Sequence, residues 1–267
     1  MNQLLSYWQT QSGLLLDQVA LIRQRPSRRA VHDARVAVKK MKALLKLANE
    51  LSTDHERFSL PHSLQLIFGT AGRYRETEMA LLLLRSVHKK EAILLPSFIK
   101  EQKARLTINR KNLRLSVLAD VETAIAEISV MLEELINTDD TALNESIHRL
   151  SAELVTELKD RIKEFPKKAH ACRKKSKQLY YWLQICTLNT MYDPVEMKVL
   201  HKALDALGQW HDTEVLRQRI RRFRKTCLVK GMEEEDACRK AEEWLDIKME
   251  EWLFNAREKL ELLLNAK

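Results

Sequence analysis

The sequence contains little of what tight turns and disulfide frameworks require. It has five glycines and five prolines in 267 residues, while Leu, Ala, Glu, Lys and Arg are abundant, a composition that favours long helices. Its four cysteines, Cys172, Cys186, Cys227 and Cys238, all fall in the second half and show no CxxC or other metal-ligand spacing. We therefore expect an all-α protein with reduced cysteines, without a disulfide framework or a zinc site.

Long apolar runs are also missing. No stretch approaches the roughly 20 uninterrupted apolar residues that a membrane span requires. Residues 1–26 mix apolar residues with Gln, Ser and Asp and lack a basic region ahead of an apolar core, which a signal peptide would have. These absences predict a cytoplasmic protein with no membrane partner.

Acidic residues are outnumbered by basic ones. The chain has 46 Lys and Arg against 37 Asp and Glu, a formal net charge of +9. Because a net positive charge favours negatively charged partners, we expect a polyanionic ligand.

Turn-forming residues divide the chain into intervals of helical periodicity. Apolar residues recur three and four apart within the intervals, as at Leu44, Leu47 and Leu51. This pattern predicts four helices before Asn137 and four after it, and hence two four-helix units at 1–137 and 138–267. Four prolines are predicted to lie in the first turns of helices: Pro26, Pro96, Pro166 and Pro194.

Two motifs recur in the same order in both halves. The pattern HxxRxxxK begins at His32 and again 138 residues later, at His170. The segment GRYRETEM begins at Gly72, and the similar GQWHDTEV begins 136 residues later, at Gly208. Since a fixed offset of similar segments indicates repeats, we infer an internal duplication.

Each HxxRxxxK segment carries cations on one helical face. At 100° per residue, six basic residues fall within a stripe about 80° wide, opposite an apolar face that includes Ala34 and Met41. They are Arg28, His32, Arg35, Lys39, Lys42 and Lys46. Like charges three and four apart repel one another by a few tenths of a kcal/mol, so the stripe is more stable with an anion bound. A charged run usually marks a solvated helix face, but the single sign and the recurrence in both halves favour a ligand site.

The same segments resemble a known family. HDARVAVKKMKALL and HACRKKSKQLYYWL are similar to the two signature helices of the CHAD domain, the conserved histidine α-helical domain, and LDALGQWHDTEVL resembles its LxxALGxxxD segment. The resemblance covers essentially the whole chain. It implies two four-helix bundles related by a pseudo-two-fold axis, with a basic groove between them that binds inorganic polyphosphate, and association with polyphosphate granules in some members. Two positions depart from the family pattern: Tyr180 replaces a basic residue, and Glu76 replaces Asp.

We therefore predict a non-catalytic polyphosphate site with no metal and no cofactor. Arginines can offer bidentate forks to phosphate, lysines act as mobile point charges, and a nearby polyanion should raise the pKa of the histidines. Glu76 and Asp212 are predicted to orient a neighbouring Arg or His, with a cap or an interhelical salt bridge as the alternative. The predicted binding residues are Arg28, His32, Arg35, Lys39, Lys42, Lys46, Arg73, Arg75, His170, Arg173, Lys174, Lys177, Tyr181 and His211.

Three glycines lie near these acids. Since a helical glycine costs about 1 kcal/mol relative to alanine, we expect Gly69, Gly72 and Gly208 to allow close approach of another helix.

Other functions have weaker sequence support. No Walker loop, HExxH, GxSxG or ExExK pattern occurs, which leaves phosphorylation of His32 or His170 as the least implausible enzymatic route. Nucleic acid would bind only weakly, because no helix-turn-helix or basic zipper is evident. Metal chelation by His32 and His170 would lack a third ligand.

Overall fold

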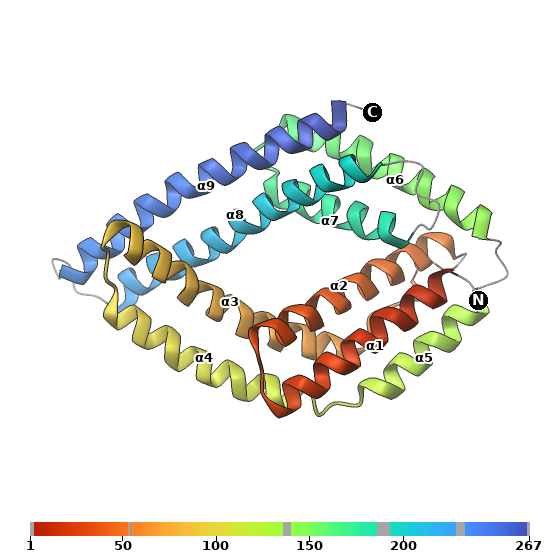
Figure 1. Cartoon of the computed structure of the whole chain (residues 1–267), viewed down its shortest axis with the longest axis horizontal. Coiled ribbons are helices and arrows are strands. Elements are labelled where there is room, and N and C mark those ends of the chain that lie inside the picture. The colour runs from red at the N-terminus through yellow and green to blue at the C-terminus, as the bar shows by residue number, and fades with distance from the viewer. Residues whose placement is uncertain are drawn as a thin grey trace.

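The computed structural model describes residues 3–52, 54, 56–135, 140–185, 193–227 and 233–265. These ranges contain helices and no strand (Figure 1), which confirms the predicted all-α class. The helices are α1 (Gln3–Gln24), α2 (Arg28–Leu51), α3 (His62–Glu91), α4 (Pro96–Ser116), α5 (Val121–Glu134), α6 (Asp140–Lys163), α7 (Ala169–Ile185), α8 (Pro194–Cys227) and α9 (Glu233–Asn265).

The first half contains one helix more than the sequence predicted. The interval from Pro96 to Asn137 is two helices, because α4 ends at Ser116 and α5 begins after Asp120. The Asp120 carboxylate accepts a hydrogen bond from the backbone N–H of Thr123 at 3.0 Å, which is the geometry of a helix N-cap. Asn137 itself lies outside the described residues.

Two of the four prolines occupy the predicted position. Pro96 and Pro194 begin α4 and α8, where a proline costs no helical hydrogen bond. Pro26 and Pro166 do not. Ser27 separates Pro26 from α2 and caps that helix, accepting from the backbone N–H of Ala30, and Pro166 lies in the turn before α7.

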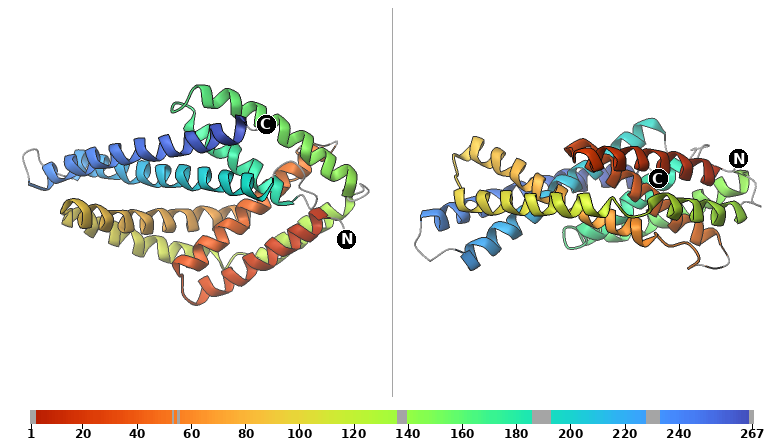
Figure 2. Two further views of the ribbon diagram at one scale, coloured as in Figure 1. Left: turned by 45° about the horizontal axis from the view of Figure 1, so that its top comes forward. Right: turned by 90° about the horizontal axis from the view of Figure 1, so that it is seen from below.

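The two signature helices face each other at the centre of the molecule. Helices α2, α3, α7 and α8 form an inner group in which α2 packs against α7 and α3 against α8. Helices α1, α4 and α5 cover this group on one side, and α6 and α9 cover it on the other (Figure 1). The α3–α4 and α8–α9 hairpins extend side by side toward one end (Figure 2). The internal duplication and its boundary, at 1–137 and 138–267, stay predictions.

The apolar side of α2 faces the core. Ala34, Met41 and Leu44, opposite the basic stripe, are buried, as the periodicity predicts. Elsewhere on α2, the indole N–H of Trp182 on α7 donates to the backbone carbonyl of Ala43 at 2.9 Å. The buried contact fixes the two basic helices relative to each other.

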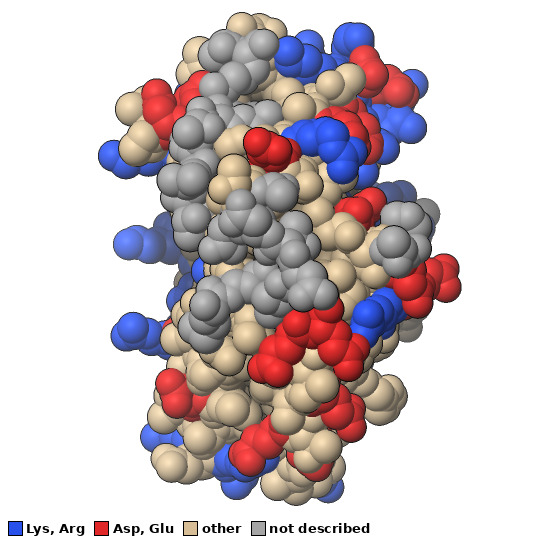
Figure 3. All heavy atoms as spheres, turned by 90° about the vertical axis from the view of Figure 1, so that its right-hand side faces the viewer, with Lys and Arg blue, Asp and Glu red and all other residues tan. Residues whose placement is uncertain are grey.

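Figure 3 shows the face of the molecule at the end where α1 begins, where basic and acidic side chains are interspersed. Within the described ranges, none of the helices contains an apolar stretch long enough to cross a bilayer.

Three of the four cysteines are free thiols: Cys172, Cys227 and Cys238. Cys186 lies outside the described residues.

Candidate anion-binding site

Charged side chains from both halves converge between α2, α3, α7 and α8. Each of them lies close enough to others to affect their pKa values or to have its own affected. We call this group the central cluster. It consists of Arg35, Lys39, Arg75, Arg173, Lys177, His211 and Asp212.

The charged forms of the two lysines in the central cluster are destabilised. Burial, together with Lys177, Arg35 and other cations, lowers the pKa of Lys39 to about 7. Burial and Arg173 likewise lower the pKa of Lys177 to about 8. Because Asp212 is the one carboxylate in the central cluster, a bound anion would relieve this repulsion.

Arg35 and Arg173 occupy equivalent positions in the two HxxRxxxK motifs. Burial is the main cause of a lowered pKa in both. The Nε atom of each is buried and has no hydrogen-bond partner among the described residues. Since buried donors are nearly always satisfied, each of these guanidinium groups has a donor for which the described chain supplies no acceptor.

Gly72 makes room for Arg35. The Nη1 group of Arg35 donates to the backbone carbonyl of Phe68 at 2.8 Å, and its guanidinium carbon lies 4.5 Å from the centroid of the Phe68 ring. A Cβ atom at position 72 would lie 2.5 Å from that Nη1. The predicted close approach is thus confirmed for Gly72. The prediction is wrong for Gly208, because a Cβ atom there would have no atom within 4 Å. A Cβ atom at Gly69 would make only an ordinary contact with Arg73, at 3.8 Å.

A shallow hollow adjoins the central cluster in the first half. Arg28, Arg29, His32 and Arg75 line it, with a volume of about 360 Å³. Burial and the nearby Arg75 lower the pKa of His32. Arg28, His32 and Arg75 were predicted site residues, whereas Arg29 was not, because it lies off the calculated stripe.

The second half surrounds its histidine differently. The Nε2 atom of His170 lies 3.1 Å from Oε2 of Glu214, and Nδ1 of His211 lies 3.7 Å from the same oxygen. The rings of His170 and Trp210 are 4.7 Å apart between centroids. Burial and Arg173 lower the pKa of His211 to about 4, so this imidazole is neutral at pH 7 in the unliganded protein.

Glu76 makes an interhelical salt bridge, the alternative noted from the sequence. Its Oε2 lies 3.2 Å from Nη2 of Arg219 on α8. Arg219 also donates through Nη1 to Thr77 and to Gln102, each at 3.2 Å. Asp212 instead lies within the central cluster, where burial raises its pKa and Arg75 and Arg173 oppose that rise.

Other predicted residues lie outside the central cluster. Tyr181 is close to it, since Arg173 partly offsets the effect of burial, which raises the pKa of Tyr181. Lys46 donates to Oε1 of Gln178 at 2.9 Å. Lys42, Arg73 and Lys174 are exposed, and they have no ion pair with any carboxylate of the described residues. The basic stripe therefore divides into a half-buried centre and an exposed outer part.

Two features were not predicted from the sequence: Arg219 beside Glu76, and Glu214 beside His170. Arg219 lies seven residues after Asp212, which places both on one face of α8, so the periodicity contained a signal for it. Glu214 belongs to the repeated GQWHDTEV segment, but its proximity to His170 depends on how α7 packs against α8.

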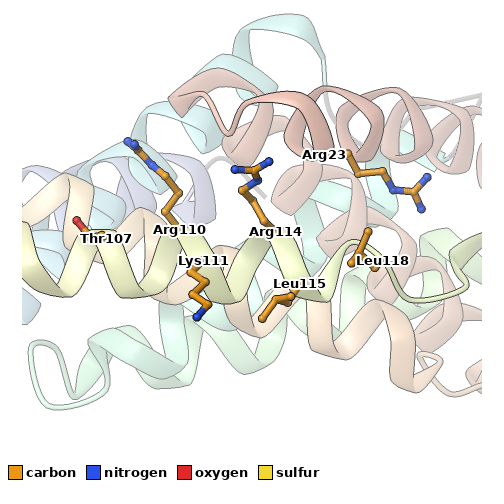
Figure 4. A pocket seen from close by; sticks show the side chains of 7 residues that line it. All are labelled: Arg23, Thr107, Arg110, Lys111, Arg114, Leu115 and Leu118. Atoms are coloured by element: carbon orange, nitrogen blue, oxygen red, sulfur yellow. The ribbon is translucent and has the colours of Figure 1, made fainter.

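A second basic region lies on α4, away from the central cluster. Arg110, Lys111 and Arg114 line a pocket of about 430 Å³ together with Arg23, Thr107, Leu115 and Leu118 (Figure 4). Its leucines, Leu115 and Leu118, are 57% and 69% exposed. This pocket was not predicted from the sequence.

Comparison with known proteins identifies the family. The model of the CHAD domain family matches residues 6–221. A crystal structure of the CHAD domain from the plant Ricinus communis is 15% identical and covers 99% of this chain and 91% of its own, with a TM-score of 0.77. PptA from Streptomyces chartreusis is 16% identical and covers 97% of this chain and 98% of its own, with a TM-score of 0.72. No match was found among curated proteins. At these identities the two solved structures show the shared fold alone. Because the family model matches most of this chain, the chain belongs to the CHAD domain family.

Proposed function

We propose that the protein binds inorganic polyphosphate in the central cluster and catalyses no reaction on it. The observation that carries the proposal is the pair of equivalent arginines, Arg35 and Arg173, whose Nε atoms are buried without a partner among the described residues. Phosphate oxygens are strong acceptors that match the guanidinium fork.

The arrangement of the central cluster favours a long, thin anion. Arg35 and Lys39 come from α2, and Arg173 and Lys177 come from α7, which packs against it. An anion that neutralises all four must contact both halves. Polyphosphate carries about one charge per phosphate and has no base edges to be read, so spacing of cations along its chain suffices for recognition.

Family membership supports the same ligand, because the CHAD resemblance implies polyphosphate binding. Association with polyphosphate granules in the cytoplasm is part of this proposal. The exposed outer cations, Lys42, Lys46 and Lys174, would extend the contact along the polymer beyond the central cluster.

A binding titration at physiological salt tests the proposal. Long-chain polyphosphate, duplex DNA and ATP are compared at equal phosphate concentration. We expect polyphosphate to bind at least about tenfold more tightly than either competitor, equivalent to 1.4 kcal/mol or more. Equal affinity for polyphosphate and DNA would contradict the proposal and indicate attraction by net charge alone.

A further inference from the structure

Three potential metal ligands converge at the edge of the central cluster in the second half. They are Nε2 of His170 on α7, together with an imidazole nitrogen of His211 and a carboxylate oxygen of Glu214 on α8. All three ligand atoms lie within 4.8 Å of one another. We propose that His170, His211 and Glu214 bind a divalent transition-metal ion of the Zn²⁺ type, which also coordinates a phosphate oxygen of bound polyphosphate. The second part rests on the proposed function, and the first part does not.

The distances between the three ligand atoms fit coordination of a single metal ion. Zinc binds imidazole nitrogen and carboxylate oxygen at about 2.0–2.2 Å, which places tetrahedral ligands about 3.4 Å apart. The observed separations from Glu214 Oε2 are 3.1 Å to His170 Nε2 and 3.7 Å to His211 Nδ1. Two histidines and one glutamate are a known zinc ligand set, and three protein ligands leave one position open.

His211 has a ring nitrogen without a hydrogen-bond partner among the described residues. Its Nδ1 atom is buried and makes no hydrogen bond with any of them, and the lone pair of such a nitrogen can bind a metal ion. Because His211 and Glu214 are one helical turn apart on α8, the backbone holds both on the same face.

Neighbouring cations make metal binding depend on the anion. Arg173, Lys177 and Lys39 face His211, and Arg173 is also close to Glu214. These charges oppose a divalent cation in the free protein. Bound polyphosphate would neutralise them and supply an oxygen to the open coordination position, so metal and polyphosphate should each strengthen binding of the other by the same factor.

The first half provides an internal contrast. Arg75 occupies the position equivalent to His211, and Glu78 is equivalent to Glu214. With an arginine in place of the second imidazole, the set around His32 retains one nitrogen ligand and gains a permanent cation. The metal site is therefore a property of the second half, and His211→Arg is the substitution that converts it to the pattern of the first.

The metal is tested first without polyphosphate. Wild-type full-length chain is titrated with Zn²⁺ by calorimetry, and Co²⁺ is added as a spectroscopic probe. We expect one ion per chain, with the intense visible absorption of tetrahedral Co²⁺. His211→Arg and Glu214→Gln should each weaken Zn²⁺ binding roughly tenfold or more. Glu214→Gln preserves side-chain shape, and thermal melts establish that both variants are folded.

His201→Arg is the matched control. His201 also lies on α8 and pairs with a carboxylate, Asp205, at 3.0 Å, but the described residues supply no third ligand there. The control should bind Zn²⁺ as the wild type does. Absence of Zn²⁺ binding to the wild type, or equal binding by wild type and His211→Arg, would overturn the metal site.

The coupling is tested on immobilised polyphosphate with and without Zn²⁺. Direct chelation of Zn²⁺ by the polymer affects all variants equally, so the comparison is between wild type and His211→Arg. Zn²⁺ should increase the affinity of the wild type several-fold more than that of the variant. Equal enhancement would overturn the phosphate contact of the metal. Failure of the metal-free wild type to bind polyphosphate would instead contradict the proposed function, so the two failures are distinguishable.

Discussion

The two halves of the molecule place a histidine at equivalent positions and surround it with different chemistry. His32 adjoins a hollow lined by arginines, including Arg75. His170 lies against Glu214 and beside the ring of His211. The exchange of Arg75 for His211 accounts for most of the difference. Repeated motifs thus place side chains at matching positions, while a single residue decides whether the position suits an anion or, as we propose, a metal.

The two halves have the same chemistry at the residues to which polyphosphate is proposed to bind. Arg35 and Arg173 both have a buried, unpartnered Nε, and Lys39 and Lys177 both have lowered pKa values. Substitutions in the arginine and lysine pairs should therefore have the same effect in both halves. Substitutions of the equivalent glycines should have different effects in the two halves.

The largest effect is expected from charge reversal of the paired arginines. A charge-assisted Arg–phosphate interaction contributes about 1.5–3 kcal/mol, so Arg35→Glu and Arg173→Glu should each weaken polyphosphate binding roughly tenfold or more. The double variant should nearly abolish binding, because the polymer contacts both halves. Affinity is measured by titration at several salt concentrations, and the salt slope should fall by about one per lost phosphate contact.

Arg114→Glu is the control for charge reversal. Arg114 lines the α4 pocket, and no described carboxylate pairs with it, unlike Arg57 and Lys248, which pair with Glu134 and Glu251. Its reversal should change affinity only slightly. An equal loss at Arg35 and Arg114 would mean that net charge alone determines binding.

The next largest effect is expected on the pH dependence of the affinity for polyphosphate. Polyphosphate favours the protonated lysines, but in the free protein the pKa values of Lys39 and Lys177 are about 7 and about 8. Affinity should therefore fall several-fold as pH rises from 6 to 9 at constant ionic strength, with proton uptake on binding near pH 7.5. Replacing both lysines with arginine should flatten the pH profile, because arginine stays charged. An unchanged profile would exclude these lysines as its source.

A smaller effect is expected on the stability of the free protein. A lysine whose folded pKa is lowered binds fewer protons in the folded than in the unfolded state. It therefore destabilises the fold most at low pH, and this penalty fades as pH rises from the folded toward the unfolded pKa. Lys39→Met should raise the melting temperature at pH 6 and raise it less at pH 9.5. Lys42→Met, at an exposed position, is the control, and a lower melting temperature for Lys39→Met at both pH values would contradict the argument.

The sequence predicted features that depend on local periodicity. The apolar face of α2 and the paired HxxRxxxK motifs follow from residues three and four apart, and the structure places both motif helices in contact. The break between α4 and α5 was missed because Leu113, Val117 and Val121 continue the apolar spacing across it. Asp120 was the remaining signal, since its side chain caps α5.

Contacts between helices could not be derived in this way. Lys46 and Lys39 lie on the same predicted stripe, but in the structure Lys39 lies close to cations of α7, whereas Lys46 donates to Gln178. The salt bridge of Glu76 with Arg219 also depends on the packing of α3 against α8. Periodicity gives the face on which a residue lies, and only the packing of a second helix decides what that face meets.

The smallest expected effects come from the equivalent glycines, and they separate the halves. Gly72→Ala would bring a Cβ within 2.5 Å of Nη1 of Arg35, so the guanidinium must shift and weaken its bond to the Phe68 carbonyl. Gly208→Ala meets no atom within 4 Å and gains about 0.5–1 kcal/mol of helix propensity.

Gly72→Ala should therefore weaken polyphosphate binding a few-fold, whereas Gly208→Ala should leave affinity unchanged and raise the melting temperature by about 1–3 °C. Titration and thermal unfolding of the two variants, made under identical conditions, check both expectations. Since the glycines occupy equivalent positions in the repeated segments, each variant is the control for the other. Equal losses of affinity would show that both glycines serve the site in the same way, and the asymmetry assigned to Arg35 would be wrong.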